Sequence, residues 1–443
     1  MTNQASVDVF QVPFGRGKRT FSLPPGVTGT EIATHPAAYL RDPGEAAHRA
    51  ILEPVAGPHL RELAARARSV CIAVTDATRA CPDHLLVPPM LSELEAAGVP
   101  PASVTILVAV GAHRASTDAE KREKLGSAIV DRYKVVDHDA TDDANLVPVM
   151  DGPGGIPFRI NRIAAEADLL LSTGLVEPHQ YAGFSGGGKT VAIGCGDEAT
   201  IAYTHGPAML DHPGVRLARL DGNPFQDAVR LVAKRANLAF VGNAVLDEEG
   251  RIVAVAYGPP EAVQDALAER AAPLFTAPIP AQVDIAVAGV GYPKDANLYQ
   301  ASRAASYLQF APTPVVRQGG AIVIPAECPE GAGDGDGERR FLAAMAVDGG
   351  PEAVIQRVRR EGIRPGEQRA YVMSLVLRDV TVIVAGILDP DAARAVGFLP
   401  AATIEDGLAV AAEVVGTPAQ ALVVPHALLT LPVVETGRLA EIG

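Results

Sequence analysis

The chain has little aromatic content and few cysteines. None of its 443 residues is tryptophan, and aromatic residues make up only 5%. Its core must therefore consist of aliphatic side chains, and a hydrophobic content of 48% in a chain of this length is ample for two domains. The four cysteines show no C-x-x-C spacing and no disulfide framework: Cys71, Cys81, Cys195 and Cys328. We expect thiols in a reducing compartment, and a cytoplasmic protein.

Long apolar runs and basic stretches are also missing. No run reaches the roughly 18 apolar residues of a membrane helix, and the first residues lack the apolar segment of a signal peptide. With 52 acidic against 38 basic residues, the net charge is −14. No stripe of lysine and arginine is present to bind phosphates. We therefore expect neither a membrane nor a nucleic-acid partner, and any anionic ligand must meet local positive charge, for which Arg79, Arg114 and Arg303 are candidates.

Apolar runs of strand length alternate with helical patterns, which predicts an α/β fold with largely parallel sheets. Three of these predicted strands are Val70–Val74, Val104–Val110 and Asp168–Leu175. Polar residues follow each one directly: Asp76 and Arg79, then His113, then His179. In open α/β sheets the carboxyl ends of parallel strands form the ligand site. We expect these side chains to lie at one edge of a doubly wound sheet.

The chain divides into two predicted α/β domains. Residues 1–275 form the first, which begins with a hairpin around residues 14–17 and contains the polar strand ends. A proline-rich stretch at 277–281 predicts a linker. Residues 276–403 form the second domain, and we expect residues 404–443 to pack back on the first.

The stretch from Leu169 to Gly206 contains most of the candidate chemistry. It includes His179, a turn with Gly186, Gly187 and Gly188, and then Lys189 and His205. Residues 183–190 also satisfy G-x-x-x-x-G-K-[ST], the phosphate-binding loop of nucleotide hydrolases. In that motif the loop leaves its strand directly, whereas here residues 177–182 intervene. A P-loop-type nucleotide-binding enzyme is therefore kept as the alternative reading.

Motifs along most of the chain support another interpretation. Asp76-Ala-Thr-Arg79 and Gly111-Ala-His-Arg114 precede His179, Lys189 and His205, which are spaced by ten and sixteen residues, and residues 291–300 read GYPKDANLYQ. In this order the sequence resembles the nickel-dependent lactate racemase family. The resemblance implies an isomerase that interconverts the enantiomers of a small 2-hydroxy acid, with its active site in the cleft between the two domains.

The proton at C2 of a 2-hydroxy acid is very weakly acidic, so removing it as a hydride avoids a carbanion. That route needs a base for the hydroxyl proton on either face, and histidine titrates near neutral pH. The resemblance implies that His113 and His179 are this pair and that Asp76 and Arg79 line the site. It also implies a pyridinium-3,5-bisthiocarboxylic acid mononucleotide, a nickel-pincer nucleotide attached to Lys189 beside Gly186, Gly187 and Gly188. His205 would then be the only protein ligand to nickel, and cofactor-maturation proteins are implied partners.

The resemblance further implies that Tyr299, Gln300 and the residue at 303 bind the substrate. Lactate racemases have a lysine at this last position, whereas this chain has Arg303. Because arginine presents a planar, bidentate fork, the exchange is not neutral at a carboxylate site. Together with Arg369 it suggests 2-hydroxy acids that are longer than lactate or carry a second carboxylate. A cofactor carrier without catalysis is a third reading.

Overall fold

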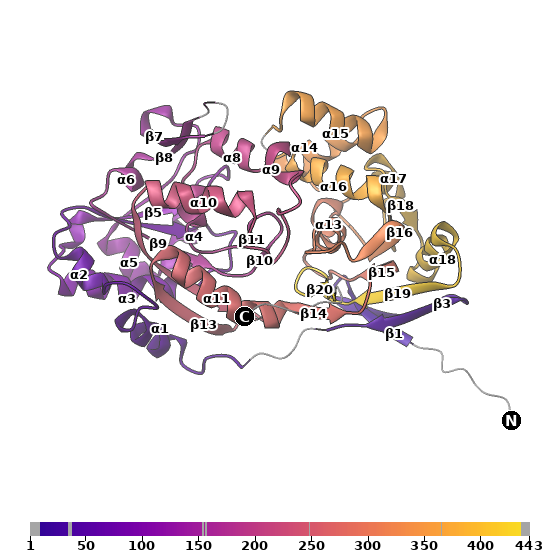
Figure 1. The fold of residues 1–443 in the computed structure, drawn as a ribbon, viewed down its shortest axis with the longest axis horizontal. Coiled ribbons are helices and arrows are strands. Elements are labelled where there is room, and N and C mark those ends of the chain that lie inside the picture. The colour runs from indigo at the N-terminus through magenta and orange to yellow at the C-terminus, as the bar shows by residue number, and fades with distance from the viewer. Residues whose placement is uncertain are drawn as a thin grey trace. The chain divides into compact units, whose positions relative to one another are not determined.

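The computed structural model describes residues 9–33, 38–152, 155, 157–247, 249–364 and 366–435 (Figure 1). The chain divides into two compact units, one of residues 36–274 and the other of residues 1–35 with 275–443. Each unit contains one six-stranded, largely parallel sheet. The predicted α/β class is therefore confirmed.

The sheet of unit 36–274 has the strand order β13-β12-β9-β4-β5-β6. All neighbours are parallel except the β12–β13 hairpin. Its strands are β4 (Val70–Thr75), β5 (Val104–Ala109), β6 (Lys134–Asp137), β9 (Leu169–Leu175), β12 (Leu238–Leu246) and β13 (Ile252–Gly258). Because the central strand β4 is buried along its whole length, its sequence VCIAVT is almost entirely apolar.

Helices cover this sheet and complete its core. In α3, Leu86, Met90 and Leu94 recur every fourth residue, so one face of the helix is buried in the same apolar cluster as Ile72 of β4. The helices of the unit outside the stretch after β9 are α1 (Pro43–Leu52), α2 (Leu60–Ala64), α3 (Asp83–Ala96), α4 (Asp118–Leu125), α5 (Ser127–Arg132), α6 (Arg162–Ala165), α10 (Pro224–Arg235) and α11 (Pro260–Phe275), with short 3-10 turns η1 (Pro101–Ser103) and η2 (Asp143–Asn145).

The stretch after β9 is made of short elements. A small hairpin of β10 (Pro178–His179) and β11 (Gly183–Phe184) leads into the glycine-rich turn. Three short helices come next: α7 (Lys189–Ala192), α8 (Glu198–Thr204) and α9 (Pro207–Leu210). A separate hairpin of β7 (Leu146–Asp151) and β8 (Pro157–Asn161) precedes β9 in the chain.

The sheet of the other unit has the order β18-β17-β16-β15-β19-β3, with every neighbouring pair parallel. Its strands are β3 (Val27–Glu31), β15 (Val283–Ala288), β16 (Val316–Pro325), β17 (Thr381–Ala385), β18 (Leu399–Ala401) and β19 (Ala419–Val424). The hairpin expected around residues 14–17 is present as β1 (Val9–Phe14) and β2 (Gly17–Ser22). The helices are α12 (Leu298–Ala301), α13 (Arg303–Gln309), α14 (Asp336–Met345), α15 (Gly350–Glu361), α16 (Gln368–Asp379), α17 (Pro390–Ala395) and α18 (Ile404–Val415).

Strands from the first and last parts of the described chain belong to this second sheet, which corrects the expected domain boundaries. The cause is strand pairing: β3, near the start, pairs with β19, near the end, and β19 pairs with β15. Helix α18 packs on β16 and β17 of the same sheet. Residues 1–35, expected in the first domain, and 404–443, expected to pack back on it, therefore group with residues 275–403.

The predicted linker at 277–281 is also corrected, because it overlaps a strand. Strand β14 (Thr276–Ile279) pairs in parallel with β20 (Leu431–Val434) as a two-stranded sheet. A two-stranded sheet leaves one edge of each strand without a partner, and proline is tolerated on such edges. Pro278 therefore does not prevent the pairing.

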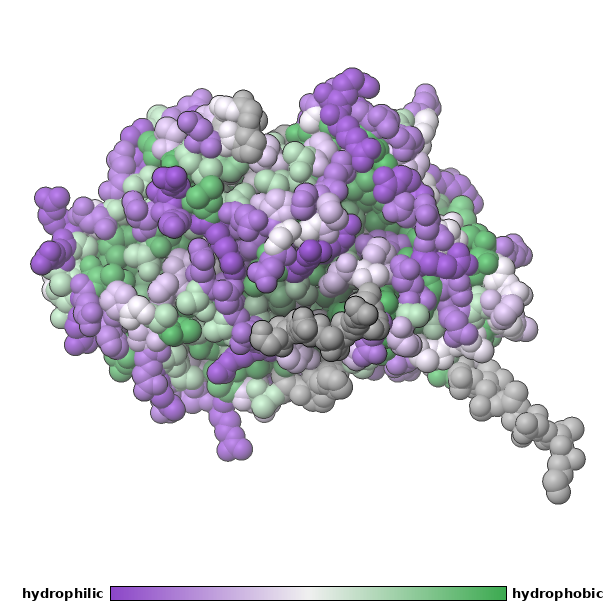
Figure 2. Space-filling model, in the orientation of Figure 1, coloured by the Kyte–Doolittle hydropathy of each residue, from purple (hydrophilic) through white to green (hydrophobic). Residues whose placement is uncertain are grey.

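The surface of the second unit reflects its helix patterns. In α15, buried Val354, Ile355 and Val358 lie on one face, and arginines and glutamates occupy the rest. Figure 2 shows hydrophilic side chains gathered over this helix. Among the described residues, no helix has both the length and the apolar character needed to cross a membrane.

Candidate active site

Three neighbouring strands of unit 36–274 deliver polar side chains to one edge of the sheet. Strands β9, β4 and β5 lie side by side and run parallel. Asp76 and His113, which come directly after β4 and β5, meet there, with His113 Nδ1 2.6 Å from Asp76 Oδ2. Gly111 makes the turn before His113 with a φ of +57°, which glycine adopts without strain. The predicted juxtaposition of these two strand ends is therefore present.

The turn after β4 holds Asp76 as a carboxylate. Burial would raise the pKa of Asp76, but hydrogen bonds from His113 and Thr78, together with the positive charge of Arg79, lower it. The Thr78 hydroxyl donates to Asp76 Oδ1 at 2.7 Å, and the Arg79 backbone N–H donates to the Asp76 carbonyl. Asp76 is 5% exposed and thus keeps its charge while largely shielded from water.

The glycine-rich turn is packed against protein. A Cβ on Gly186 would lie 2.5 Å from the Val176 side chain, and a Cβ on Gly188 would lie 2.5 Å from the Ala233 Cβ. The Gly187 N–H donates to Asn243 Oδ1 at 2.7 Å. Close packing on neighbouring protein thus explains the glycines, and their binding to a cofactor stays a prediction.

The turn does not offer the phosphate cradle that G-x-x-x-x-G-K-[ST] requires. The backbone N–H groups of Ser185, Gly187 and Lys189 already donate to protein oxygens. The Thr190 hydroxyl, which in that motif reaches magnesium, donates to the Thr173 carbonyl at 2.7 Å. The β10–β11 hairpin also separates the turn from β9. These contacts count against the nucleotide-binding alternative.

Lys189 has an unusual amine. Desolvation, followed by the positive charge of Arg79, lowers its pKa from 10.5 to about 7, although Glu177 and Asp76 raise it. Among the described residues, the amine has no hydrogen-bond or ion-pair partner. At neutral pH a large fraction of Lys189 is therefore unprotonated and nucleophilic.

His205 presents one ring nitrogen as an electron-pair donor. It ends α8, and its Nδ1 lies 3.0 Å from the Ile201 carbonyl oxygen, which only accepts hydrogen bonds. Nδ1 therefore carries the proton and Nε2 is bare. Burial, followed by the charge of Lys189, lowers the pKa of His205 to about 4, so the ring stays neutral. A neutral imidazole fixed through a backbone carbonyl is the usual form of a metal-bound histidine.

His179 and His205 share an aromatic cluster. The Tyr181 ring lies edge-on to both imidazoles, 5.7 Å from His179 and 5.5 Å from His205 between ring centroids. Phe225 contacts the same two rings from α10, at 6.2 and 5.2 Å. The structure therefore brings His179 to His205, while electrostatics connect His205, Lys189, Arg79 and Asp76.

A buried carboxylate beneath this edge is absent from the sequence-based predictions. Asp83, at 0% exposure, accepts hydrogen bonds from the hydroxyls of Thr75 and Thr173 and lies 3.1 Å from Lys124 Nζ. The Lys124 amine also donates to the carbonyls of Arg79 and Cys81. This network fixes the turn that carries Asp76 and Arg79. In the sequence Asp83 has the pattern of an ordinary helix start, and Lys124 lies in a run of charges typical of a solvated face.

Tyr299, Gln300 and Arg303 lie in the other unit, on α12 and the start of α13. Arg303 donates to the Tyr307 hydroxyl at 3.1 Å, and Arg369 donates to Ser306 Oγ at 3.2 Å while its guanidinium lies 5.6 Å from the Tyr299 ring centroid. The buried Gln300 Oε1 has no hydrogen-bond partner among the described residues. Arg369 of α16 thus contacts α12 through Tyr299 and α13 through Ser306.

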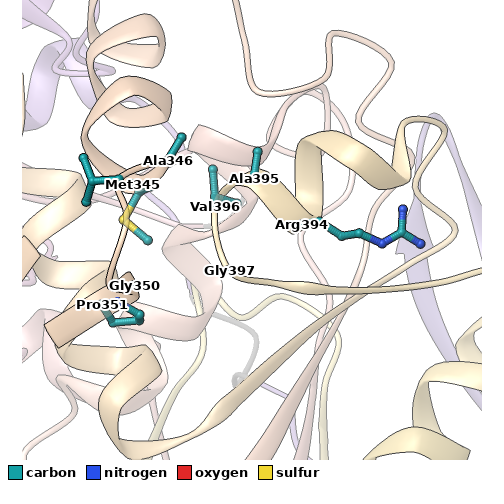
Figure 3. A pocket seen from close by; sticks show the side chains of 9 residues that line it. Met345, Ala346, Gly350, Pro351, Arg394, Ala395, Val396 and Gly397 are labelled. Atoms are coloured by element: carbon teal, nitrogen blue, oxygen red, sulfur yellow. The ribbon is translucent and has the colours of Figure 1, made fainter. Parts of the chain in front are cut away.

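Two other features lie apart from this chemistry. Arg114, weighed as an anion-binding residue, instead pairs with Glu120 at 2.6 Å. A hollow of about 290 Å³ lies in the second unit and is lined by residues 345–347, 350–351 and 394–397 (Figure 3). No predicted site residue lines it, and its one guanidinium, Arg394, pairs with Asp391.

Two domain families match the chain, and named proteins resemble it along most of its length. Residues 14–218 match the lactate racemase N-terminal domain and residues 277–431 the lactate racemase C-terminal domain. The lactate racemase of Lactiplantibacillus plantarum is 33% identical over 389 residues, covering 87% of this chain and 89% of that protein. The lactate racemase of Thermoanaerobacterium thermosaccharolyticum is 29% identical, covering 94% and 97%.

Solved structures show the same fold. The lactate racemase apoprotein of Thermoanaerobacterium thermosaccharolyticum superposes with a TM-score of 0.83 at 27% identity, covering 96% of this chain and all of that one. A Thermotoga maritima protein superposes with a TM-score of 0.63 at 20% identity, which bears on the fold alone. Fold and sequence together define an enzyme of the isomerase class. The chain belongs to the lactate racemase family.

Proposed function

We propose that the protein racemises or epimerises a 2-hydroxy acid through a lysine-tethered nickel-pincer nucleotide, with His113 and His179 exchanging the hydroxyl proton. One observation carries the proposal: unit 36–274 groups three features. They are the largely unprotonated amine of Lys189, the bare Nε2 of His205, and the imidazole of His113 hydrogen-bonded to a carboxylate. Two relatives named lactate racemase support the reaction type.

The residues present fit this cofactor. The Lys189 amine is in the form that attacks a carboxyl derivative, and His205 Nε2 is in the form that binds a metal. Among the described residues, no group of three or more histidine, cysteine or acidic side chains gathers to hold a metal ion. One imidazole suffices only if the cofactor supplies the other donors. When bound, this group accepts a hydride from C2 of the substrate and returns it.

The protein's own side chains handle the proton and the charges. The Asp76 carboxylate holds His113 through Nδ1 and directs the opposite ring nitrogen away from itself. Arg79 has an exposed side chain with no ion-pair partner among the described residues, so it is available to a carboxylate or a phosphate. His179 lies in the aromatic cluster beside His205. These groups supply the acid, the base and the positive charge that the reaction needs.

We infer the substrate range from the second unit. Tyr299, Gln300 and Arg303 are assigned to the substrate on their match to family positions. Arg303 in place of lysine, with Arg369 on the neighbouring helix α16, favours 2-hydroxy acids with a second carboxylate or a longer chain over lactate alone. We also propose a cytoplasmic location, which four free cysteines support because such thiols persist in a reducing compartment.

Coexpression with cofactor-maturation proteins tests this proposal. We expect an intact mass increased by the nucleotide, bound nickel, and conversion of one lactate or malate enantiomer into the other. Lys189→Ala should lose the adduct, and Lys234→Ala, on α10, is the matched control that should keep it. Racemisation by unmodified protein would refute the mechanism. An adduct with nickel but no turnover of any 2-hydroxy acid would instead identify a cofactor carrier.

A further inference from the structure

The two histidines assigned to proton transfer have opposite hydrogen-bond surroundings at Nδ1. The partner of His113 Nδ1 is a carboxylate, which only accepts hydrogen bonds once it is ionised. The partners of His179 Nδ1 are two backbone N–H groups, which only donate. A neutral imidazole has one protonated and one bare nitrogen, so each set of partners selects one tautomer.

His113 has its proton on Nδ1. Its Nδ1 lies 2.6 Å from Asp76 Oδ2, within charge-assisted hydrogen-bond range. The hydroxyl of Thr78 donates to the other oxygen of the same carboxylate, so both Asp76 oxygens act as acceptors. Nε2 of neutral His113 is therefore bare. The His113 side chain is 47% exposed, which leaves room for a substrate hydroxyl to approach.

His179 has its proton on Nε2. The backbone N–H of Tyr181 donates to Nδ1 at 3.2 Å, and that of Ala182 donates to the same atom at 3.1 Å. A proton on Nδ1 would lose both bonds and face two N–H groups at close range. The loop is fixed in this position because the Tyr181 carbonyl accepts from buried Asn223 and the ring of Tyr181 packs on His205.

We propose that the two imidazoles are not interchangeable: His113 is the proton acceptor and His179 the hydrogen-bond donor of the resting site. This assignment rests on the proposed function and makes Asp76 and the amides of Tyr181 and Ala182 positioning groups. In oxidation, the substrate O–H bond breaks and its proton moves to His113 Nε2. The hydride from C2 would go to the cofactor, when that group is bound. The 2-oxo acid that results has its oxygen facing the Nε2–H of His179.

The same contacts constrain oxidation of the opposite enantiomer, whose hydroxyl faces His179. For His179 to accept a hydroxyl proton, its Nε2 must first be bare, which requires a proton on Nδ1 and the loss of two amide hydrogen bonds. The enantiomer whose hydroxyl faces His113 meets no such requirement. One face of the planar intermediate thus meets His113, whose Nε2 is already bare. The other face meets His179, which must first change its tautomer.

Nitrogen NMR of the full chain without cofactor tests the assignment directly. In protein labelled with ¹⁵N-histidine, long-range ¹H–¹⁵N correlations distinguish protonated from bare ring nitrogens. His113→Gln and His179→Gln assign the two signals by their disappearance. The chain holds its own references, because His205 Nδ1 faces the Ile201 carbonyl, whereas His138 Nε2 faces the Gly196 carbonyl and its Nδ1 faces the Asn161 amide.

We expect His113 to match His205 and His179 to match His138. Asp76→Asn should move His113 toward a mixture of tautomers and leave His179 unchanged. Thr78→Val, which keeps the His113–Asp76 bond, should alter neither. The same tautomer in both rings, or tautomer averaging at His179 in the unmodified chain, would overturn the proposal. Because this measurement needs neither cofactor nor turnover, its result is separate from the test of racemisation.

Discussion

The two sheets of the molecule have the same number of strands and differ in the residues at the carboxyl ends of those strands. In unit 36–274 the chain after β4 and β5 presents Asp76 and His113 to each other. In the other unit the chain after β15 and β19 is closed by backbone: the Gly289 N–H donates to the Val424 carbonyl, and a Cβ on Gly289 would lie 2.3 Å from the Pro425 carbonyl oxygen.

Both parallel sheets thus have a carboxyl end at which a site can form, and the residues after each strand determine the chemistry there. At the carboxyl end of the first sheet, a side-chain hydrogen bond holds Asp76 and His113 against each other. After β15 and β19 in the other sheet, Gly289 allows two backbones to meet where a Cβ would not fit. The comparison predicts that substitutions with large chemical effects belong to the carboxyl end of the first sheet.

The largest effect is expected at the two imidazoles. His113→Ala or His179→Ala should keep the Lys189 adduct and lower kcat by about 10²–10⁴-fold, as the loss of a general acid or base does. The matched control is His426→Ala, an exposed histidine past the carboxyl end of β19, which should leave kcat unchanged. Chiral chromatography measures the rate. Normal turnover in either of the first two variants would defeat the two-histidine mechanism.

The next effect concerns the reactivity of Lys189. Its pKa of about 7, against an ordinary 10.5, leaves the amine unprotonated above about pH 7. Acylation by an amine-directed reagent should therefore rise through pH 7 at Lys189, and other lysines should respond at higher pH. Arg79→Gln should move the midpoint upward because the positive charge of Arg79 lowers this pKa, and Arg79→Lys should keep it. Peptide mass spectrometry reads each site, and a midpoint at Lys189 equal to that of other lysines would contradict the desolvated environment.

The buried carboxylate beneath the carboxyl end of the first sheet should govern stability. Asp83→Ala removes the carboxylate that pairs with the Lys124 amine and accepts from two threonine hydroxyls. It should lower the free energy of unfolding by about 3–5 kcal/mol, as breaking a buried pair does. Asp131→Ala removes the exposed partner of Arg122 and should cost about 0–1 kcal/mol. Urea unfolding of both variants measures the difference. Equal losses would mean that the network does not hold the turn.

A smaller effect is expected from Asp76, which acts through His113. Asp76→Asn should lower kcat/KM by about 10–100-fold, the range seen when a group that orients an essential histidine is lost. Thr78→Val removes only the bond to the other carboxylate oxygen and should retain most of the activity. Steady-state kinetics in both directions tests this. A Thr78→Val loss as large as that of Asp76→Asn would assign the effect to the turn as a whole.

The smallest effect is expected in the second unit and concerns choice of substrate. Arg303→Lys should shift preference toward lactate and away from malate and 2-hydroxyglutarate, because a lysine is a point charge and lacks the bidentate fork. Arg317→Lys, whose native guanidinium pairs with Asp284 on β15, is the control and should not change preference. Relative kcat/KM across that panel, with phenyllactate included, measures it. Lactate as the sole substrate of the unaltered protein would reject the broader range.

Much of the fold could be predicted from local patterns of apolar residues in the sequence. Buried parallel strands such as β4 and β9 are apolar along nearly their whole length, so short-range sequence identifies them and the polar residues that come after them. The pairing of β3 with β19 was not readable, because it joins segments almost a whole chain apart and nothing local in either strand specifies its partner. Pro278 was misleading, since proline within a strand of a two-stranded sheet looks the same in sequence as proline in a linker.

The site divides in the same way. Motif spacing indicated His113, His179, Lys189 and His205 through family resemblance, and the structure shows the hydrogen-bond partners of Nδ1 in the three histidines. The Asp83–Lys124 pair could not be predicted because burial of a charged residue depends on tertiary packing. The same limit applies to the protein that packs on the glycines, because the contacts of Gly186 with Val176 and of Gly188 with Ala233 depend on tertiary structure.

The joining of β3 to β19 has a consequence for the nascent chain. Residues 36–274 are contiguous and can fold as soon as they leave the ribosome, whereas β3 emerges first and then waits for a neighbour synthesised at 419–424. At about 5–20 residues per second, that wait lasts on the order of 20–80 s. During this time β3 lacks its partner strand β19, and its unpaired backbone groups are open to a chaperone or to a strand of a second nascent chain.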